Sequence, residues 1–237
     1  MQKTKIEWCD YSLNPVKGIC PVGCYYCYAT RLYRRFGWNP EIRFDVQPLF
    51  DVGKIKTPSR IFVGSTMELF GEWIKPEWIH SILFFCKAYS EHTFIFLTKC
   101  PEHFSRWPPF PQNAYVGVSV TNQEQYDKAI HYLKNVQASV KFLSFEPLLE
   151  HISGETMSKL TDAGISWVII GCQTPKSLKT MPKFEWVKEI VDAADKARIP
   201  AFLKNNLIPL LPLQIRKEIW GQVVLRQEFP GEVTGIP

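Results

Sequence analysis

Three cysteines lie within eight residues near the start of the chain, at Cys20, Cys24 and Cys27. Their spacing is C-x3-C-x2-C. Thiolates this close together can bind one inorganic centre, and iron–sulfur clusters are held by short-spaced cysteines of this kind. A 4Fe–4S cluster has four irons, so three cysteine ligands leave one iron free for a ligand that the protein does not supply. The spacing therefore predicts a 4Fe–4S cluster with one open position.

Two other uses of these cysteines stay open. A structural zinc site usually has four ligands, often arranged as two C-x2-C pairs, and only Cys24 and Cys27 form such a pair. The five histidines are scattered singly, and we interpret them as structural or surface residues: His80, His92, His103, His131 and His151. The three cysteines could also be unreactive core residues. Gly23 and Pro21 between them favour a loop over a packed element.

Composition limits the class of protein. A chain of 237 residues with 46% hydrophobic content is long enough for one large α/β domain. The remaining cysteines are isolated and the total of seven is odd, so we expect no disulfide framework. The first residues lack a signal peptide's apolar core, and no apolar run approaches a membrane span. We therefore expect a cytoplasmic protein without membrane contact. The net charge of +5 permits an anionic partner such as nucleic acid.

The elements that must position the cysteines follow an alternating pattern. Residues 28–36 are expected to form a helix that ends at Gly37, and a short first strand is expected within residues 1–17. Helix patterns begin near Pro76, behind an Asn122 cap, and at Phe184. Apolar, β-branched strands alternate with them at 61–64, 94–97, 115–120, 140–145, 167–171 and 201–203. Such alternation predicts a parallel sheet covered on both faces.

Polar residues come directly after these strands. In an α/β barrel the active site is built from such strand ends. Polar residues also occur at strand ends simply because strands meet solvent there. Six successive strand ends carry them: Ser65, Thr66 and Glu68; Thr98 and Lys99; Ser119; Ser144 and Glu146; Gln173; and Lys204. We expect one domain over 1–237, with 37–58 as a lid or insertion and 208–237 as a C-terminal extension.

The cysteine loop resembles that of the radical S-adenosylmethionine (SAM) enzymes, in which an aromatic residue precedes the third cysteine, as Tyr26 does here. The whole chain resembles a phage-associated, radical-SAM-like family of unknown function, which is distantly similar to the spore photoproduct lyases. The stretches that carry this resemblance include 5–8, 14–16, 96–99, 116–120, 142–149 and 167–171. The chain departs from the family pattern at Cys172–Pro175, where Gly-Glu-Ser-Gly is usual, and at Asn205–Leu207.

The resemblance implies a partial TIM-type (β/α)6 barrel that binds a 4Fe–4S cluster and SAM and uses an external electron donor. It implies that Tyr26 contacts the adenine and that Ser65, Thr66 and Glu68 accept from the methionine ammonium. The methionine carboxylate or the ribose would be contacted by four further residues: Thr98, Lys99, Ser119 and Ser144. Glu146 would contact the ribose or the substrate. Lys204 would bind an anionic group. Candidate partners are a nucleic acid, whose base would be the substrate, and a three-Cys-motif partner protein. The alternative is a non-enzymatic iron–sulfur or zinc protein that binds a partner or nucleic acid.

Overall fold

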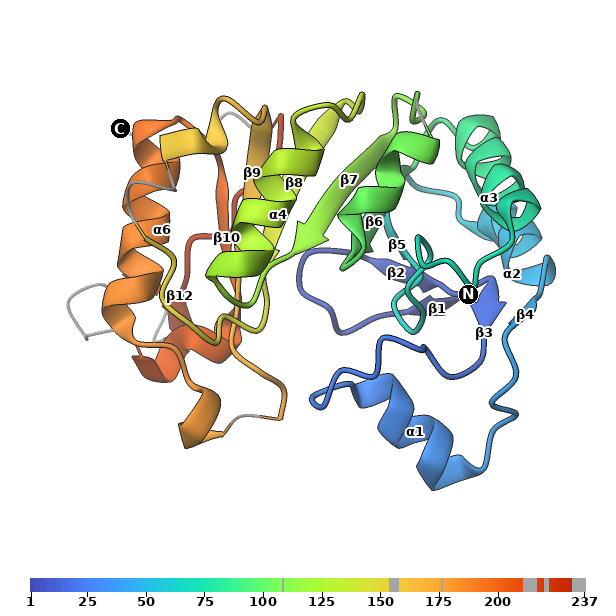
Figure 1. Ribbon diagram of the computed structural model, residues 1–237, viewed down its shortest axis with the longest axis horizontal. Coiled ribbons are helices and arrows are strands. Elements are labelled where there is room, and N and C mark those ends of the chain that lie inside the picture. The colour runs from blue at the N-terminus through green and yellow to red at the C-terminus, as the bar shows by residue number, and fades with distance from the viewer. Residues whose placement is uncertain (108, 154–157, 176, 211–216, 220–221, 232–237) are drawn as a thin grey trace. The chain divides into compact units, whose positions relative to one another are not determined.

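The chain is divided into two compact units. The structure, a computed structural model, describes residues 1–107, 109–153, 158–175, 177–210, 217–219 and 222–231. One unit comprises Met1–Gly117 with Val136–Ser139, and the other comprises Val118–Asn135 with Val140–Pro237 (Figure 1). None of the helices formed by these described residues is long and apolar enough to cross a membrane.

The first unit is organised around a mostly parallel sheet. Its strand order is β1-β2-β5-β6-β7. Strands β2, β5 and β6 are parallel neighbours, whereas β1 is antiparallel to β2. A separate antiparallel pair is formed by β3 and β4. The bounds are β1 Gln2–Lys3, β2 Tyr11–Leu13, β3 Val16–Lys17, β4 Arg43–Phe44, β5 Arg60–Val63, β6 Thr93–Thr98 and β7 Ala114–Ser119.

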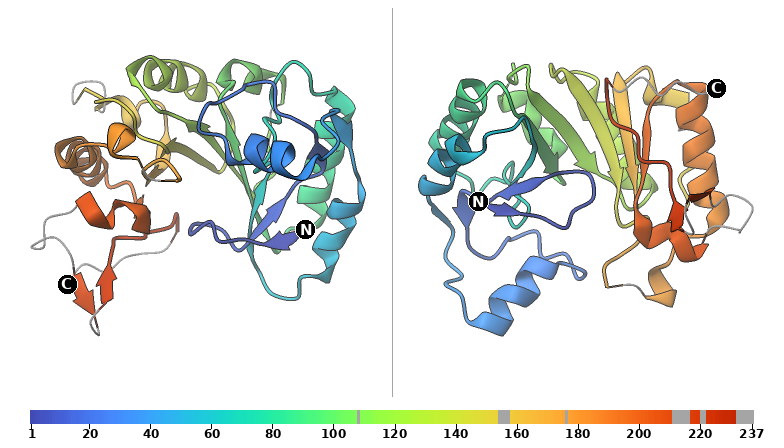
Figure 2. Two further views of the ribbon diagram at one scale, coloured as in Figure 1. Left: turned by 90° about the horizontal axis from the view of Figure 1, so that it is seen from below. Right: turned by 180° about the vertical axis from the view of Figure 1, so that it is seen from behind.

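The helices of the first unit lie at two ends of it. Figures 1 and 2 show α1 at the end opposite to α3. The helix α1 ends where predicted, because Gly37 adopts a left-handed conformation and its N–H bonds the carbonyl of Tyr33. The bounds are α1 Tyr28–Phe36, α2 Gln47–Phe50, η1 Asp51–Lys54, α3 Pro76–Ala88 and η2 Pro101–Arg106, where η denotes a 3-10 helix.

The second unit repeats the parallel arrangement. Strand β9 pairs in parallel with both β8 and β10, and α4 and α6 lie on one side of these strands (Figure 2). The predicted Asn122 cap is confirmed, since its side chain accepts from the N–H of Gln125. The bounds are α4 Gln123–Leu133, β8 Val140–Phe145, η3 Ser158–Leu160, β9 Ile165–Ile170, η4 Leu178–Thr180, α6 Phe184–Lys196, β10 Ala201–Leu203, η5 Asn205–Leu210, β11 Lys217–Ile219 and β12 Gln222–Val224.

The six strands predicted from residue 61 onward are confirmed, and β8 and β9 are buried at nearly every position. This is typical of parallel strands covered on both faces. The protein is therefore of the mixed α/β class, and closure into a partial barrel stays a prediction. The short first strand expected within residues 1–17 is found at Tyr11–Leu13, which pairs with β5, whereas residues 7 and 8 form a turn.

The segment predicted to be a lid or insertion and the predicted C-terminal extension both contain secondary structure. Residues 37–58 contain β4, α2 and η1, and Pro48, Leu49 and Val52 are buried there. Their role as a lid or insertion stays a prediction. In the proposed C-terminal extension, η5, β11 and β12 are described, whereas 211–216, 220–221 and 232–237 lie outside the described residues.

Candidate functional site

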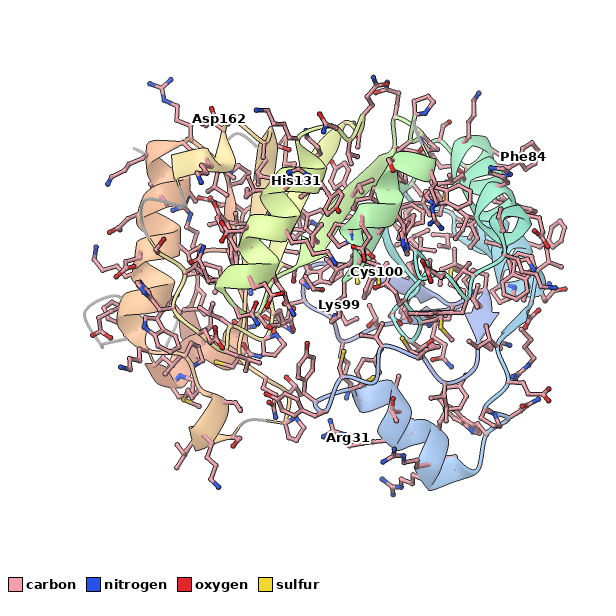
Figure 3. All side chains as sticks on the ribbon, in the orientation of Figure 1. Arg31, Phe84, Lys99, Cys100, His131 and Asp162 are labelled. Carbon is pink, nitrogen blue, oxygen red and sulfur yellow. The ribbon has the colours of Figure 1, made fainter. Side chains whose placement is uncertain are left out.

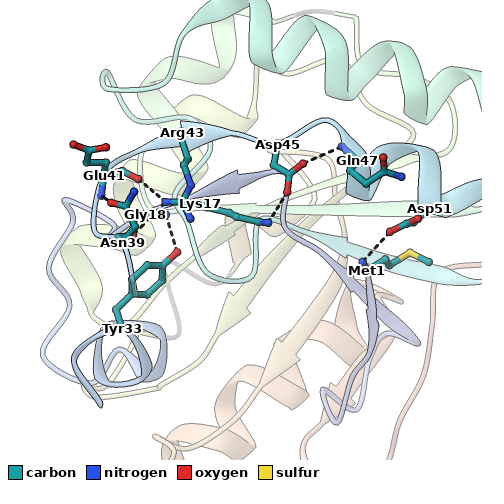
Figure 4. Close-up of polar contacts among 10 residues, drawn as sticks. All are labelled: Met1, Lys17, Gly18, Tyr33, Asn39, Glu41, Arg43, Asp45, Gln47 and Asp51. Atoms are coloured by element: carbon teal, nitrogen blue, oxygen red, sulfur yellow. Dashed lines mark hydrogen bonds and ion pairs between the residues drawn. The ribbon is translucent and has the colours of Figure 1, made fainter. Parts of the chain in front are cut away.

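The cysteine loop is fixed at its start by backbone contacts. Gly18 has a φ of +121°, and a Cβ atom there would lie 2.6 Å from the carbonyl oxygen of Glu41. Its N–H donates to the hydroxyl of Tyr33 on α1 at 2.7 Å (Figure 4). The N–H of Ile19 donates to the carbonyl of Pro40 at 2.9 Å. Only glycine fits this close approach, so the loop's path depends on Gly18.

The loop presents three half-buried thiols, and Cys27 directly precedes α1. Burial raises the pKa of the Cys20 thiol above its ordinary value, and backbone hydrogen bonds from Glu68 and Val22 partly oppose this. Burial also raises the pKa of Tyr26, with a further contribution from the neighbouring Cys24 thiol, to which Tyr26 is hydrogen-bonded. The predicted adenine contact Tyr26 is thus held against the cysteines.

The three loop thiols are the candidate ligands of a metal centre. Among the described residues, no three His, Cys, Asp or Glu side chains converge as a group that could hold a single metal ion. In a 4Fe–4S cluster each cysteine binds a different iron, so the sulfurs need not meet at one point. Three half-buried thiols on one loop, with backbone N–H groups directed at one sulfur, suit that chemistry.

Glu68 connects the cysteine loop to the end of β6. One carboxylate oxygen accepts from the Thr98 hydroxyl at 2.5 Å and from the N–H of Phe70 at 3.0 Å. The other accepts from the N–H of Lys99 at 2.7 Å. Figure 3 labels Lys99 directly after β6. Three of the predicted site residues therefore do meet, and most of the hydrogen-bonding capacity of the buried Glu68 carboxylate is already used within the protein.

Ser65 and Thr66 are joined to a residue that sequence analysis did not include in the site. The side-chain oxygen of Asn14 accepts from the N–H of Thr66, and the Asn14 and Ser65 side chains are hydrogen-bonded at 3.0 Å. Tyr28 donates to the carbonyl of Ser65 at 2.9 Å. Asn14 directly follows β2, so it occupies the same kind of strand-end position from which the other site residues were predicted.

In the second unit, the ends of three strands come together. Lys204, after β10, forms an ion pair with Glu146, after β8. Gly171, after β9, leaves room for this contact, because a Cβ atom there would lie 2.9 Å from the Lys204 side chain. The predicted residues Glu146 and Lys204 therefore do meet, and each partly neutralises the charge of the other.

The side chain of Asn206 is in contact with the backbone of Cys172. The side-chain oxygen of Asn206 accepts from the N–H of Cys172 at 3.0 Å, and its amide nitrogen donates to the carbonyl of Cys172 at 2.8 Å. The amide side chain thus pairs with the backbone as a neighbouring strand would. The Asn206 side chain therefore holds the backbone at Cys172 in place.

Three buried side-chain polar atoms of the second unit lack a hydrogen-bond partner in the described structure. They are the hydroxyl of the fully buried Ser144, the side-chain oxygen of Gln173 and the Nε atom of Arg226. Ser119 is buried as well, with 2% of its surface exposed. Buried polar groups usually have a partner, so an unsatisfied hydroxyl at a strand end is consistent with a missing ligand.

A cavity of about 260 Å3 lies in the first unit, apart from the residues predicted to form the site. Two of the histidines interpreted as structural or surface residues line it, His80 and His103, together with Arg106 and Trp107. The Nδ1 atom of His103 is 2.5 Å from the carbonyl oxygen of Phe70, which fixes that ring. His103 therefore has the structural role expected from the sequence and also contributes to the wall of a cavity.

The fold is shared with solved structures of spore photoproduct lyase. One mutant of that enzyme is similar with a TM-score of 0.60 and 13% identity, over 85% of this chain and 78% of the lyase chain. Spore photoproduct lyase complexed with dinucleoside spore photoproduct is similar with a TM-score of 0.54 and 16% identity, over 93% and 68% of the two chains. A mutant with bound AdoMet and dinucleoside spore photoproduct gives 0.53 and 16% over the same shares.

These likenesses define the class as an α/β protein with the spore photoproduct lyase fold. Residues 3–207 match the family described as "Protein of unknown function (DUF5131)", and the chain belongs to that family. No curated protein matches the sequence.

Proposed function

We propose that this chain is a radical SAM enzyme with a partial TIM-type (β/α)6 barrel, and that a nucleic-acid base is its substrate. Cys20, Cys24 and Cys27 would bind a 4Fe–4S cluster, and SAM would be the second cofactor. When bound, the cluster would supply the electron that cleaves SAM to a 5′-deoxyadenosyl radical, which abstracts hydrogen from the substrate. A cytoplasmic location, an external electron donor, a phage-associated role and a three-Cys-motif partner protein belong to the same proposal.

The first unit's contribution would be to hold the cysteine loop and orient the cofactor. The backbone of Glu68 hydrogen-bonds toward Cys20, and its carboxylate is held by Thr98 and the backbone of Lys99. These contacts fix Glu68 against the loop, so one remaining lone pair would be available to the methionine ammonium. Ser65 and Thr66, positioned by Asn14, would supply further acceptors.

The second unit offers hydrogen-bonding groups that the protein itself leaves unused. The buried hydroxyl of Ser144 has no partner among the described residues and would bond a ribose or carboxylate oxygen of the cofactor. Lys204 and Glu146 form an ion pair with each other. An anion bound by Lys204, or a ribose bound by Glu146, would therefore have to bind while this ion pair is present. The cofactor carries the radical chemistry, and the protein orients it and excludes competing reactions.

One observation carries the proposal: the turn after β5 is joined both to the cysteine loop and to the end of β6. Glu68 reaches Cys20 through its backbone and Thr98 through its carboxylate. Three thiols alone would fit several iron–sulfur proteins. Three thiols joined to a polar strand-end network on the fold of an enzyme crystallised with bound AdoMet favour a SAM-dependent one.

The test is anaerobic reconstitution with iron and sulfide, then reduction in the presence of SAM and measurement of 5′-deoxyadenosine. We expect the wild-type chain to turn brown and to form the product. Single Cys→Ala substitutions at positions 20, 24 and 27 should reduce product formation to background, because each removes one cluster ligand.

Cys100→Ala is the matched control, since Cys100 is also a half-buried thiol of the first unit but lies outside the loop. It should retain iron and product. Full product formation by all three loop variants would contradict the proposal, as would a wild-type protein without iron.

The second candidate is a non-enzymatic protein that keeps the cluster for structure, redox sensing or partner binding. It is favoured by the altered stretch at Cys172 and Gln173, where the family's usual carboxylate is missing. A brown protein that forms no 5′-deoxyadenosine, with a reductant that works on a control enzyme, would select this candidate. A colourless protein that binds zinc would select a zinc-stabilised binding module.

A further inference from the structure

An unusual share of the exposed aromatic surface lies in one short stretch of the first unit. Tyr25, Tyr28, Phe36 and Trp38 are 70%, 44%, 55% and 49% exposed. They are half of the large hydrophobic side chains found exposed in the described part of the chain. Together with Arg34 and Arg35 we call them the aromatic–arginine surface. Exposed apolar side chains gathered in one place usually mark a binding surface.

The same stretch is strongly basic. Residues 25–43 contain four arginines and one glutamate, a net charge of +3 within a chain whose total is +5. The first turn of α1 has no acidic residue. Arg34 and Arg35 are exposed and form no ion pair with any described residue. This surface therefore suits a polyanion better than an apolar or basic partner.

The rings on this surface are already arranged for stacking. Phe36 and Trp38 are stacked, with centroids 5.4 Å apart and planes 20° apart. The guanidinium of Arg35 lies over the Phe36 ring, and the buried Tyr33 supports Trp38 edge-on. Gly37, in a left-handed conformation with open space around it, turns the chain so that Trp38 returns to the helix. The rings thus form an ordered platform with an arginine attached.

The surface begins inside the cysteine loop. Tyr25 lies between Cys24 and Cys27 and packs edge-on against Tyr26, with ring centroids 5.0 Å apart. Tyr28 directly follows Cys27 and bonds the carbonyl of Ser65. Figure 3 shows Arg31 on the same helix, α1. A polymer bound along this surface would therefore run up to the cysteines themselves.

We propose that the aromatic–arginine surface binds single-stranded nucleic acid, with unstacked bases on the exposed rings and phosphates at Arg34 and Arg35. Aromatic side chains and arginines combine in this way in proteins that bind single strands, because every base has a stacking face. A duplex keeps those faces covered, so it fits this surface less well. This inference rests on the proposed function in one respect, because it takes the bound strand to be the substrate. Binding of the strand itself does not depend on SAM cleavage.

The test measures binding of a fluorescein-labelled 12-nucleotide single strand, as DNA and as RNA, to the reconstituted full chain by fluorescence anisotropy. The measurement is repeated from 50 to 300 mM salt. We expect binding at 50 mM salt that weakens steeply as salt rises. The substitution R34Q/R35Q should weaken binding at least tenfold and lower the log–log salt slope by about 1.4, since each phosphate contact contributes about 0.7 for single strands.

The matched control is K56Q/K87Q, which removes two exposed charges from the same unit outside this surface. It should leave the salt slope within about 0.3 of wild type, because neither lysine would contact a phosphate. Trp38→Ala should weaken binding about fivefold or more, whereas Trp38→Phe should restore most of it, because a ring is what stacks. Circular dichroism and thermal melting check that each variant is folded.

Three results would overturn the inference: no binding at 50 mM salt, equal losses in R34Q/R35Q and K56Q/K87Q, or equally tight binding of an abasic strand. The first would leave the surface to a protein partner, and the last would show a non-stacking polyanion site. A chain that binds the strand but forms no 5′-deoxyadenosine would refute the proposed function and leave this inference standing.

Discussion

The buried carboxylate of Glu68 has one proposed role and one observed role. The resemblance to radical SAM enzymes implies that it accepts from the methionine ammonium of SAM. Its observed hydrogen bonds link the turn after β5 to the end of β6. A carboxylate that accepts from Thr98 and the N–H groups of Phe70 and Lys99 is already held in position. Such prior fixation suits a ligand-binding group, because orienting it on binding costs no further entropy.

Glu68→Gln should therefore destabilise the chain even without any cofactor. The amide nitrogen would face the hydroxyl of Thr98 or the N–H of Lys99, leaving a buried donor without an acceptor, which costs about 1–3 kcal/mol. Urea unfolding of the cofactor-free chain measures this loss. Glu77→Gln, at an exposed position on α3, is the control and should change stability by about 0.5 kcal/mol or less. Equal stability of the two variants would show that the Glu68 network adds nothing to the fold.

At the scale of elements, the cysteine loop is determined by the glycines on either side of α1. Gly18 fixes the start of the loop and Gly37 ends the helix. Both have positive φ, yet their surroundings differ. A Cβ atom at Gly18 would lie 2.6 Å from the backbone of Glu41, whereas one at Gly37 would meet nothing within 4 Å. An alanine at Gly37 would therefore have only the cost of an unusual backbone conformation, whereas an alanine at Gly18 would also collide with the backbone.

Gly37→Ala should lower the free energy of unfolding by about 1 kcal/mol, which is the cost of an alanine in the left-handed region. Gly18→Ala should cost at least twice as much and also lower the iron content after reconstitution, because the backbone around Glu41 and the loop must shift. Thermal melting and iron analysis measure both effects. If Gly18→Ala melts like Gly37→Ala and retains its iron, the loop tolerates that shift and does not depend on Gly18.

At the scale of the whole molecule, SAM should stabilise the reconstituted chain by mass action. A ligand present at 100 times its Kd, and bound only by the folded state, contributes about 2.7 kcal/mol. For a chain of this length that corresponds to a rise in Tm of roughly 5–10 °C. Anaerobic thermal melting measures the rise. Cys20→Ala should lose most of it and Cys100→Ala should keep it. The same rise in both variants would mean that SAM binds without the cluster.

This chain resembles the spore photoproduct lyase structures much more in fold than in sequence. The lyase structures share its fold over most of the chain at 13–16% identity. At such identity the fold is shared, but the residues that contact substrate need not be. The recognition that we propose for this chain is therefore argued from its own residues, and the aromatic–arginine surface is where exposed rings and positive charge coincide.

Local patterns in the sequence determined most of the elements and the cysteine loop. The strand β10 and the helices α1 and α6 lie where the patterns placed them, because apolar periodicity, Gly37 and β-branched runs act over a few residues. The C-x3-C-x2-C spacing needs no tertiary information to be recognised. The first strand was expected only somewhere within residues 1–17, because its exact position is decided by pairing with β5, which lies about fifty residues away.

Tertiary structure alone decided which polar residues meet. Glu68 lies 30 residues from Thr98, Asn14 lies 51 from Ser65, and Glu146 lies 58 from Lys204. No local pattern encodes such pairings, since they arise when parallel strands end at the same edge of a sheet. The same holds for Asn206, whose side chain bonds the backbone of Cys172, 34 residues earlier in the chain. The sequence by itself determined which residues could do chemistry, and packing of the strands determined which of them act together.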